Sequence, residues 1–279
     1  MSGFPWGEWA LNLGWAAGAA LAVMLVTFAV AVRVGVHRLV DVAWGAAFAA
    51  VAVVSYALSA GSGDDGRRLL VAVLTCVWGL RLAVHIGLRG RGHGEDPRYE
   101  AMLAKAPGGR RNLYAFRMVY LLQGALVWLV SLPVQTAMYA PVGLGPLAWA
   151  GCALWCVGLF FEAVGDRQMA RFKADPANKG RIMDRGLWSL TRHPNYFGDF
   201  CVWWGIFLAA AGSWTVAGVS VVGPLVMSYL LIFGSGKRLL ERSMADRPGF
   251  AAYRARTSGF FPLPPKRRAE VAAGSGAGQ

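Results

Sequence analysis

The sequence predicts an all-α integral membrane protein with about seven transmembrane helices. Of its 279 residues, 56% are hydrophobic and only 15% are charged, whereas a soluble domain carries about 25% charged residues. The apolar residues fall in runs of about 20, the length that crosses a hydrocarbon core ~30 Å thick as a helix. This composition excludes a disordered chain and argues against an ordinary soluble globule.

Seven apolar runs are the candidates for these helices. The last two are separated by the region 212–214, and together they cover about 35 residues, too many for one crossing at ~1.5 Å per residue. We therefore expect these two runs to form a hairpin. The seven runs are approximately 10–32, 39–60, 69–88, 118–139, 147–165, 200–213 and 215–234.

The positions of lysine and arginine predict the orientation of the chain. With seven crossings, the connecting segments on one side hold 25 of the 28 basic residues, and the other side holds only Arg67 and Arg68. Because basic residues concentrate on the cytoplasmic side, we expect the N-terminus outside and the C-terminus in the cytoplasm. The basic segments are 33–38, 89–117, 166–199 and 235–279.

The net charge of +13 comes from these connecting segments, so it indicates a cytoplasmic face and a site for anionic ligands rather than a nucleic-acid partner. The four cysteines form neither a CxxC pair nor a Cys/His cluster with metal-ligand spacing. We expect no metal, and one membrane domain over residues 1–265. The basic, then Ala/Gly-rich tail 266–279 is expected to be disordered.

Pairs of polar residues spaced four apart lie at the predicted cytoplasmic ends of the helices. This spacing puts both members on one helix face, and ionisable groups in a membrane are costly enough to indicate function. They predict a single polar layer open to the cytoplasm. The pairs are Glu162 and Asp166, Asn195 and Asp199, Lys237 and Glu241, and Arg81 and His85.

Basic residues between these pairs, such as Arg171, Arg181 and Arg192, add binding capacity for anions. Guanidinium groups bind phosphates bidentately, while carboxylates and amides suit ribose and amide groups. A nucleotide cofactor uses both kinds of group, whereas a lipid-binding basic patch needs only the cations. The sequence therefore favours a nucleotide.

The most specific segment of the chain is 186–199, which reads GLWSLTRHPNYFGD. It resembles the GLWxxxRHPNYxGE signature of the bacterial membrane relatives of steroid 5-alpha-reductase, the DUF1295 or steroid 5-alpha-reductase C-terminal domain family. The resemblance runs from about residue 40 to residue 262. Other matching stretches begin at Asp41 (DVAWG), Trp78 (WGLR), Glu162 (ExxxDxQ, then Phe172-Lys173) and Glu241.

The resemblance implies seven helices and an NADPH site in a cytoplasmic-side cavity built mainly by the C-terminal half. Residues 1–140 would then form the substrate pocket, and residues 141–265 would bind the cofactor. The positions that resemble cofactor contacts are Arg91, Glu162, Asp166, Arg171, Arg181, His193, Asn195, Tyr196, Asp199, Lys237 and Glu241.

The implied activity is NADPH-dependent reduction of a C=C bond in a hydrophobic enone or enoyl substrate, steroid-, isoprenoid- or lipid-like, that enters from the membrane. The steroid enzymes polarise the enone oxygen with a Tyr and a Glu. Here Asp41 stands for the Glu, and Trp78 stands at the Tyr position, where an indole donates a hydrogen bond but is a poor acid. This departure argues against a 3-oxo-steroid. The candidate catalytic residues are Asp41, Trp44 and Arg81.

Two other classes of protein stay open. The RHPxY motif is shared with isoprenylcysteine and phospholipid methyltransferases, whose cofactor S-adenosylmethionine lacks phosphates; the long basic loops 89–117 and 166–192 favour the reductase. A transporter is disfavoured because the first, fourth and seventh runs carry no polar residue at mid-membrane. The resemblance also implies a bacterial inner membrane with the site facing the cytoplasm, and it leaves the oligomeric state undefined.

Overall fold

A computed structural model describes residues 3–234 and 236–266 of the chain. Regular structure in these residues is helical, and their one β interaction is an isolated parallel bridge between Thr191 and Ser258. The predicted all-α class is therefore confirmed for the described chain. The predicted disordered tail lies outside it from residue 267 onward.

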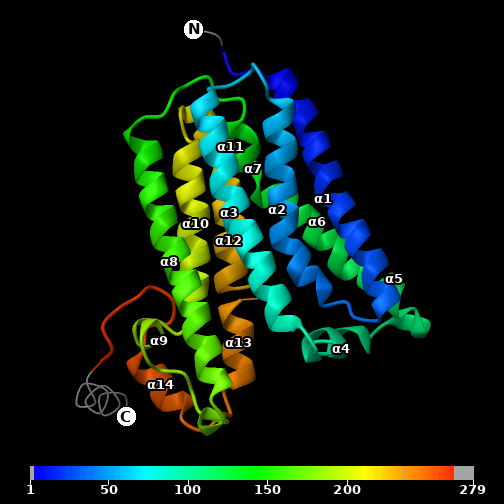
Figure 1. Cartoon of the computed structure of the whole chain (residues 1–279), viewed down its shortest axis with the longest axis vertical. Helices are drawn as coiled ribbons and strands as arrows, with labels where there is room; N and C mark the ends of the chain where they lie inside the picture. The colour runs from blue at the N-terminus through cyan, green and yellow to red at the C-terminus, as the bar shows by residue number, and fades with distance from the viewer. Residues whose placement is uncertain (1–2, 235, 267–279) are drawn as a thin grey trace, which may run out of the picture. The chain divides into compact units, whose positions relative to one another are not determined.

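The long helices account for most of the chain (Figure 1). They are α1 (Trp6–Val34), α2 (Leu39–Leu58), α3 (Asp65–Gly90), α6 (Leu122–Val130), α8 (Pro146–Ala174), α10 (Pro194–Ala210) and α12 (Val222–Ile232). The shorter helices are α4 (Pro97–Leu103), α5 (Arg111–Ala115), α7 (Leu132–Ala137), α9 (Leu187–Leu190), α11 (Trp214–Ser220), α13 (Lys237–Met244) and α14 (Phe250–Arg256). A π-helical segment, Phe116–Leu121, joins α5 to α6, and single 3₁₀ turns lie at Pro107–Gly109 and Pro176–Asn178.

Six helical stretches are long and apolar enough to cross a membrane, which indicates an integral membrane protein. The seventh predicted crossing, 200–213, falls on α10, whose 17 residues lie at the lower limit of a spanning length. The count of seven and the orientation of the termini stay predictions. The six stretches are Trp6–Val34, Leu39–Leu58, Asp65–Gly90, Arg111–Val130, Pro146–Ala174 and Trp214–Met244.

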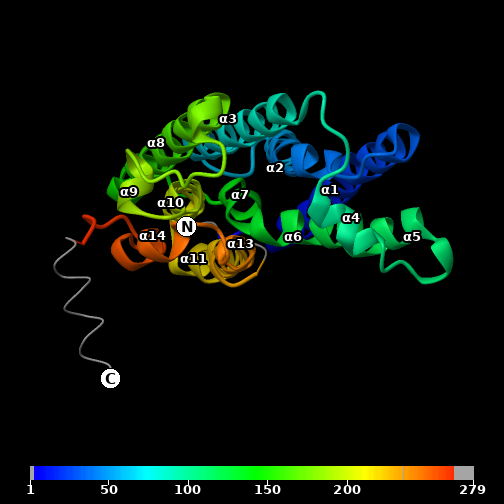
Figure 2. The same cartoon turned by 90° about the horizontal axis from the view of Figure 1, so that it is seen from below.

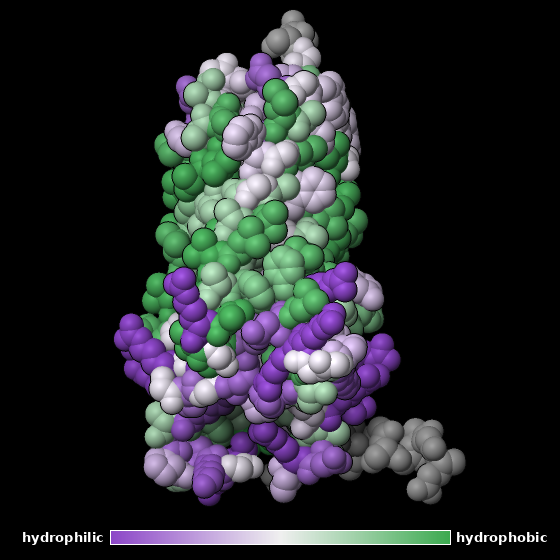
Figure 3. All heavy atoms as spheres, turned by 90° about the vertical axis from the view of Figure 1, so that its right-hand side faces the viewer, coloured by the Kyte–Doolittle hydropathy of each residue, from purple (hydrophilic) through white to green (hydrophobic). Residues whose placement is uncertain are grey.

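The exposed side chains of these stretches agree with a lipid environment. Large apolar residues such as Leu11, Trp15, Val26 and Val84 are more than half exposed, which in water would be costly. Figure 3 shows a face on which hydrophobic side chains form a broad band while hydrophilic side chains gather at one end. Such a band is the surface that hydrocarbon chains would cover.

The chain divides into two compact units that each combine separate segments. Unit 1 comprises Met1–Cys152 and Ile206–Pro224, and unit 2 comprises Ala153–Gly205 and Leu225–Gln279. The expected substrate half (1–140) and cofactor half (141–265) come from the family resemblance and not from contacts within the structure, so they stay a prediction.

Unit 1 is built around three helices, in which α2 lies between α1 and α3 (Figures 1 and 2). The backbones of α2 and α3 approach most closely at two glycines. A Cβ added to Gly45 would collide with the carbonyl oxygen of Gly79, and a Cβ on Gly79 would collide with that of Gly45. Trp78, next to this contact, is fully buried and packs edge-on against Phe48.

Two buried arginines at the start of α3 stabilise the loops of unit 1. Arg67 donates from Nε to the carbonyl oxygen of Val142 (2.9 Å) and from Nη2 to that of Gly143 (2.8 Å), and it also reaches Ala209. Arg68 donates to Ser59 Oγ and to the carbonyl oxygen of Tyr56, both at 2.9 Å. The charge pattern predicted these two basic residues on the opposite side from the basic connecting segments. In the structure both donate hydrogen bonds to backbone carbonyl oxygens.

Unit 2 contains an equally close helix contact, between α8 and α10. A Cβ on Gly198 would lie 2.6 Å from the carbonyl oxygen of Gly158 and 2.8 Å from the backbone nitrogen of Glu162. One on Gly158 would lie 2.5 Å from the carbonyl oxygen of Gly198. Only glycine allows this approach, so the Gly of the NYFGD sequence is explained by packing.

Candidate functional site

The segment 186–194 owes its shape to contacts with α8. Gly186 has a φ of 59°, and a side chain there would strike Gln168, whose Oε1 accepts a hydrogen bond from the Leu187 backbone (3.0 Å). The indole of Trp188 donates to the carbonyl oxygen of Gly165 at 3.0 Å. The G and W of the GLW sequence therefore fix the loop that leads to the RHPN residues.

The C-terminal segment 253–263 closes over this loop from its other side. Tyr253 Oη donates to the carbonyl oxygen of Trp188 (2.6 Å), and Thr191 Oγ1 donates to that of Phe260 (2.8 Å). The backbone N–H of Arg192 donates to the carbonyl oxygen of Ser258 (2.9 Å). Residues more than 60 positions apart are thus joined through backbone and side-chain hydrogen bonds.

Glu241 on α13 binds two consecutive residues of the loop. Its Oε1 accepts from Arg192 Nε at 2.9 Å and from His193 Nε2 at 3.0 Å. Arg192 also donates from Nη1 to the carbonyl oxygens of Thr257 (2.5 Å) and Arg254 (3.1 Å). The guanidinium group is thereby held in one orientation, since side-chain and backbone acceptors use several of its donors.

The hydrogen bond to Glu241 also determines the tautomer of His193. A carboxylate only accepts, so Nε2 carries the proton, and in the neutral ring Nδ1 is an acceptor. Nδ1 is buried with no partner among the described residues, and the ring stacks on Tyr196 with centroids 5.3 Å apart. A buried acceptor without a donor is the atom that a ligand N–H or O–H would satisfy.

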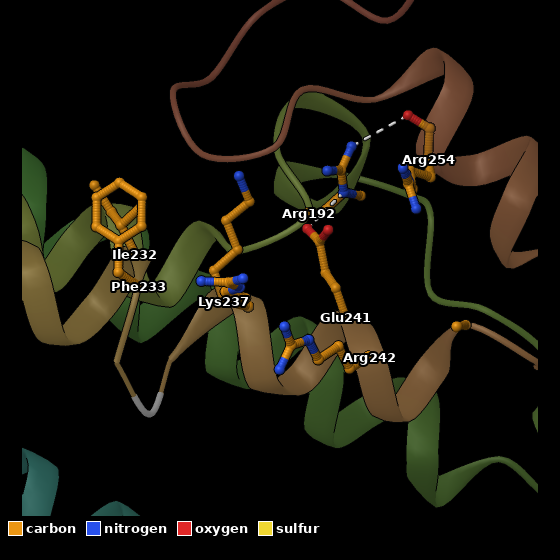
Figure 4. A pocket seen from close by; sticks show the side chains of 9 residues that line it. Arg192, Ile232, Phe233, Lys237, Glu241, Arg242 and Arg254 are labelled. Carbon is orange, nitrogen blue, oxygen red and sulfur yellow. Dashed lines mark hydrogen bonds and ion pairs between the residues drawn. The ribbon is translucent and has the colours of Figure 1, made fainter.

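Arg192 and Glu241, but not His193, border a cavity of about 500 Å³ in unit 2 (Figure 4). Glu241 and Lys237 project from α13 toward Arg192, which comes from the opposite loop. A Cβ on Gly259 would lie 2.8 Å from Lys237 Nζ and 3.1 Å from Arg192 Nη2, so these two cations converge beside that glycine. The cavity is lined by five cations and one carboxylate: Arg192, Lys237, Arg238, Arg242, Arg254 and Glu241.

The charge of this cavity is poorly balanced. Arg192 is the one lining cation that pairs with Glu241. No described acidic residue forms an ion pair with the other four lining cations. An anionic ligand would supply the missing charge, and arginine and lysine both suit phosphate groups.

Burial lowers the pKa of His193, although the Glu241 carboxylate opposes this shift. Below pH ~6.5 the unfolded chain therefore binds more protons than the folded one, and the free energy of unfolding falls as the pH falls. We expect the midpoint of thermal unfolding to decrease between pH 7.5 and 5.5, and His193→Gln to reduce that decrease. His93→Gln, at an exposed loop residue, is the control. An equal reduction in this variant would show that the pH dependence does not come from His193.

The other predicted cofactor residues of unit 2 take different positions. Glu162 is buried at the contact of α8 with Gly198. Asp166, Asn195, Tyr196 and Asp199 are half-buried on α8 and α10, whereas Arg171 and Arg181 are exposed. None of these residues lines the 500 Å³ cavity. The structure thus brings His193, Lys237 and Glu241 together, and the cofactor role of all these residues stays a prediction.

The predicted catalytic residues lie in unit 1. Asp41, in the first turn of α2, accepts a hydrogen bond from Tyr99 Oη at 2.6 Å, and Arg98 Nη2 lies 3.6 Å from its second oxygen. Trp44 is half-buried and packs edge-on against Phe48. Arg81 is half-buried on α3. Arg91, expected among the cofactor residues, lines a cavity together with Asp41 instead.

A polar network beside Asp41 was not predicted from the sequence. Both oxygens of Glu95 accept backbone N–H groups ahead of α2, from His37 (2.5 Å) and Arg38 (2.9 Å). The buried ring of His37 contacts Tyr120 Oη (3.2 Å) and Asn112 Oδ1 (3.1 Å). Glu95 thus satisfies free backbone N–H groups at the start of α2, as a helix cap does. It lies 57 residues from Arg38 in sequence, so no local pattern reveals this contact.

A family model matches this chain over most of its length. Residues 27–257 match a family described as a protein of unknown function, DUF1295. The chain belongs to the DUF1295 family. The matched range contains every candidate residue named above, and it includes Arg254 and Tyr99, which the sequence alone did not single out as site residues.

Three relatives of this DUF1295 protein come from fungi. An uncharacterized protein of Schizosaccharomyces pombe is 24% identical over 223 residues, 70% of this chain and 63% of the relative. A probable O-methyltransferase of Ustilaginoidea virens is 41% identical over 68 residues, 24% of each protein. A Delta(14)-sterol reductase of Gibberella zeae is 29% identical over 94 residues, 28% of this chain and 20% of the relative.

The matches to these relatives cover less than two thirds of their lengths. No solved structure matches the DUF1295 chain. The expected membership of the DUF1295 family is confirmed, while the expected bacterial source has no support among these fungal relatives and stays a prediction.

Proposed function

We propose that the protein is a membrane-embedded, NADPH-dependent reductase of a C=C bond in a hydrophobic enone or enoyl substrate. The observation that carries the proposal is the cavity of unit 2, in which five cations face one carboxylate. A pyrophosphate and a 2′-phosphate together offer several negative charges, and arginine and lysine side chains both bind such groups. The local likeness to a sterol reductase supports the same activity.

The alternative is an S-adenosylmethionine-dependent membrane methyltransferase, supported by 41% identity to a probable O-methyltransferase over 68 residues. S-adenosylmethionine carries a sulfonium cation and no phosphate. Four lining cations without an acidic partner would repel that sulfonium, because like charges close together are unfavourable. The charge of the cavity therefore favours the reductase.

Within this proposal, Arg192, Lys237 and Arg254, which line the cavity, hold the phosphate groups. NADPH, when bound, supplies a hydride for the β-carbon of the substrate alkene. Glu241 keeps Arg192 and His193 in place through the hydrogen bonds at 2.9 and 3.0 Å. Preorganised donors of this kind cost no reorganisation during the reaction.

Asp41 and Tyr99 are the proposed acid pair for the substrate. As the structure stands, Tyr99 Oη donates its one proton to Asp41 at 2.6 Å, so the pair acts as an acid only when Asp41 is protonated and donates to Tyr99, whose O–H then faces the substrate. Stabilising the developing enolate oxygen and delivering a proton to the α-carbon complete the reduction of the double bond. Trp44 and Arg81 are further candidate donors. A site facing the cytoplasm of an inner membrane would give access to NADPH.

Binding of the candidate cofactors by the purified full-length protein tests the proposal. Its thermal unfolding midpoint in detergent should rise with NADPH, rise less with NADH and stay unchanged with S-adenosylmethionine, because bound ligand stabilises the folded state by mass action. A rise with S-adenosylmethionine alone would establish the methyltransferase alternative and overturn the reductase.

The roles of the two units predict a contrast between variants. Asp41→Asn should leave the dissociation constant of NADPH unchanged and lower turnover, since the amide oxygen can still accept from Tyr99 but the amide cannot supply a proton. Asp166→Ala and Asn195→Ala should each weaken NADPH roughly tenfold, about 1.4 kcal/mol. Isothermal binding and single-turnover assays separate the two effects. Equal weakening of NADPH by Asp41→Asn would contradict the division of roles.

A further inference from the structure

Unit 1 contains a second charged cavity, of about 250 Å³, between the first turn of α2 and the last turn of α3. Both helices are candidate membrane spans, so the cavity lies at the level where two spans end. Polar lipid head groups occupy this level of a bilayer. The position alone makes the cavity accessible to molecules that are anchored in the membrane.

The arginines of this cavity attract its two acids, Arg89 acting on Asp41 and Arg38 on Asp96, but they form no ion pair with them. Arg38, Arg89 and Arg91 line it together with Asp41 and Asp96. Both acids bind elsewhere: Asp41 accepts from Tyr99 (2.6 Å), and Asp96 pairs with Arg98 (3.0 Å).

None of the three arginines forms an ion pair with a described acidic residue. Arg38 donates to backbone carbonyl oxygens, including that of His93 at 2.8 Å, which leaves its charge in place. The cavity therefore presents guanidinium groups that are free to bind an anion.

The remaining wall of the cavity is apolar. Leu39 and Val42 of α2 face it, as does Ile86 of α3. Gly87 also lines it, and a Cβ there would be in ordinary contact with Val42 at 3.8 Å, so the missing side chain leaves room. A soluble anion would gain nothing from these apolar groups, whereas a molecule with an anionic head and a hydrocarbon chain would use both walls.

We propose that this cavity binds the phosphate or carboxylate head group of a membrane amphiphile, with the guanidinium groups of Arg89 and Arg91 on the head and Leu39, Val42 and Ile86 along the start of the chain. Basic pockets between spans commonly hold anionic head groups in this way. The proposal does not depend on the proposed function, and it gives Arg91 a ligand other than the cofactor.

The experiment measures retention of phosphatidic acid by the full-length protein in neutral detergent, with glycerol 3-phosphate and inorganic phosphate as probes without chains. We expect Arg89→Gln combined with Arg91→Gln to weaken phosphatidic acid at least tenfold. Gly87→Leu, which keeps every charge and fills the cavity, should weaken it similarly. Arg110→Gln combined with Arg117→Gln removes two exposed arginines outside the cavity and should change the affinity less than twofold.

Three results would overturn the proposal. Unchanged affinity in both cavity variants would show that phosphatidic acid binds elsewhere. Equal affinity for inorganic phosphate and phosphatidic acid would assign the cavity to a soluble anion. Loss of NADPH binding in the double variant, with phosphatidic acid retained, would return Arg91 to the cofactor. Far-ultraviolet circular dichroism of each variant shows that it is folded, so a loss of lipid reports on the cavity.

Discussion

Gly198→Val is expected to destabilise unit 2 by about 3 kcal/mol, the upper end of the range for overpacking a well-packed core. A Cβ at this position would lie 2.6 Å from the carbonyl oxygen of Gly158 and 2.8 Å from the backbone nitrogen of Glu162. Both neighbours are helix backbone, which cannot move aside as a flexible side chain can. Thermal unfolding of the purified protein, followed by circular dichroism, measures the effect as a lower midpoint.

Gly218→Val is the matched control, because a Cβ on Gly218 in α11 meets nothing within 4 Å. The same substitution there should shift the midpoint only slightly. A similar loss in both variants would mean that valine in a helix is itself the cause. An unchanged midpoint for Gly198→Val would show that α8 and α10 are farther apart than described.

Lys237→Gln combined with Arg254→Gln is expected to weaken NADPH about 100-fold, or ~2.7 kcal/mol. Both cations line the 500 Å³ cavity, and neither forms an ion pair with a described acidic residue. Their removal therefore costs phosphate contacts without leaving a carboxylate unpaired. Fluorescence titration of NADPH measures the change, and the thermal unfolding midpoint without cofactor should stay the same.

Lys179→Gln combined with Arg185→Gln provides the control, since both residues are exposed on the loop between α8 and α9 and lie outside the cavity. Its affinity for NADPH should remain within about twofold. If this control weakens NADPH as much as the cavity variant does, the effect comes from general attraction between a basic surface and an anion, which salt would screen. That result would remove the main support for the proposed function.

Some of the site could be predicted because its signals are local in the sequence. The GLWSLTRHPNYFGD stretch places Trp188, Arg192 and His193 in one loop, and the spacing of Lys237 and Glu241 puts both on one face of α13. The contacts of Glu241 with His193 and Arg192, which lie 48 and 49 residues away in sequence, could only be inferred from family resemblance. Tyr99 and Glu95 were missed because their partners, Asp41 and His37, lie 58 residues away, beyond any periodic pattern.

The sequence by itself determined that this chain is an all-helical membrane protein with most of its basic residues in a few segments, because helix length and hydropathy follow directly from residue order. Only the tertiary structure decided which residues share a cavity. It placed Arg91 beside Asp41 in unit 1 and left Arg171 and Arg181 exposed. It also showed that Gly158 and Gly198 bring two helix backbones together. Such contacts depend on packing between distant segments, which a linear pattern does not specify.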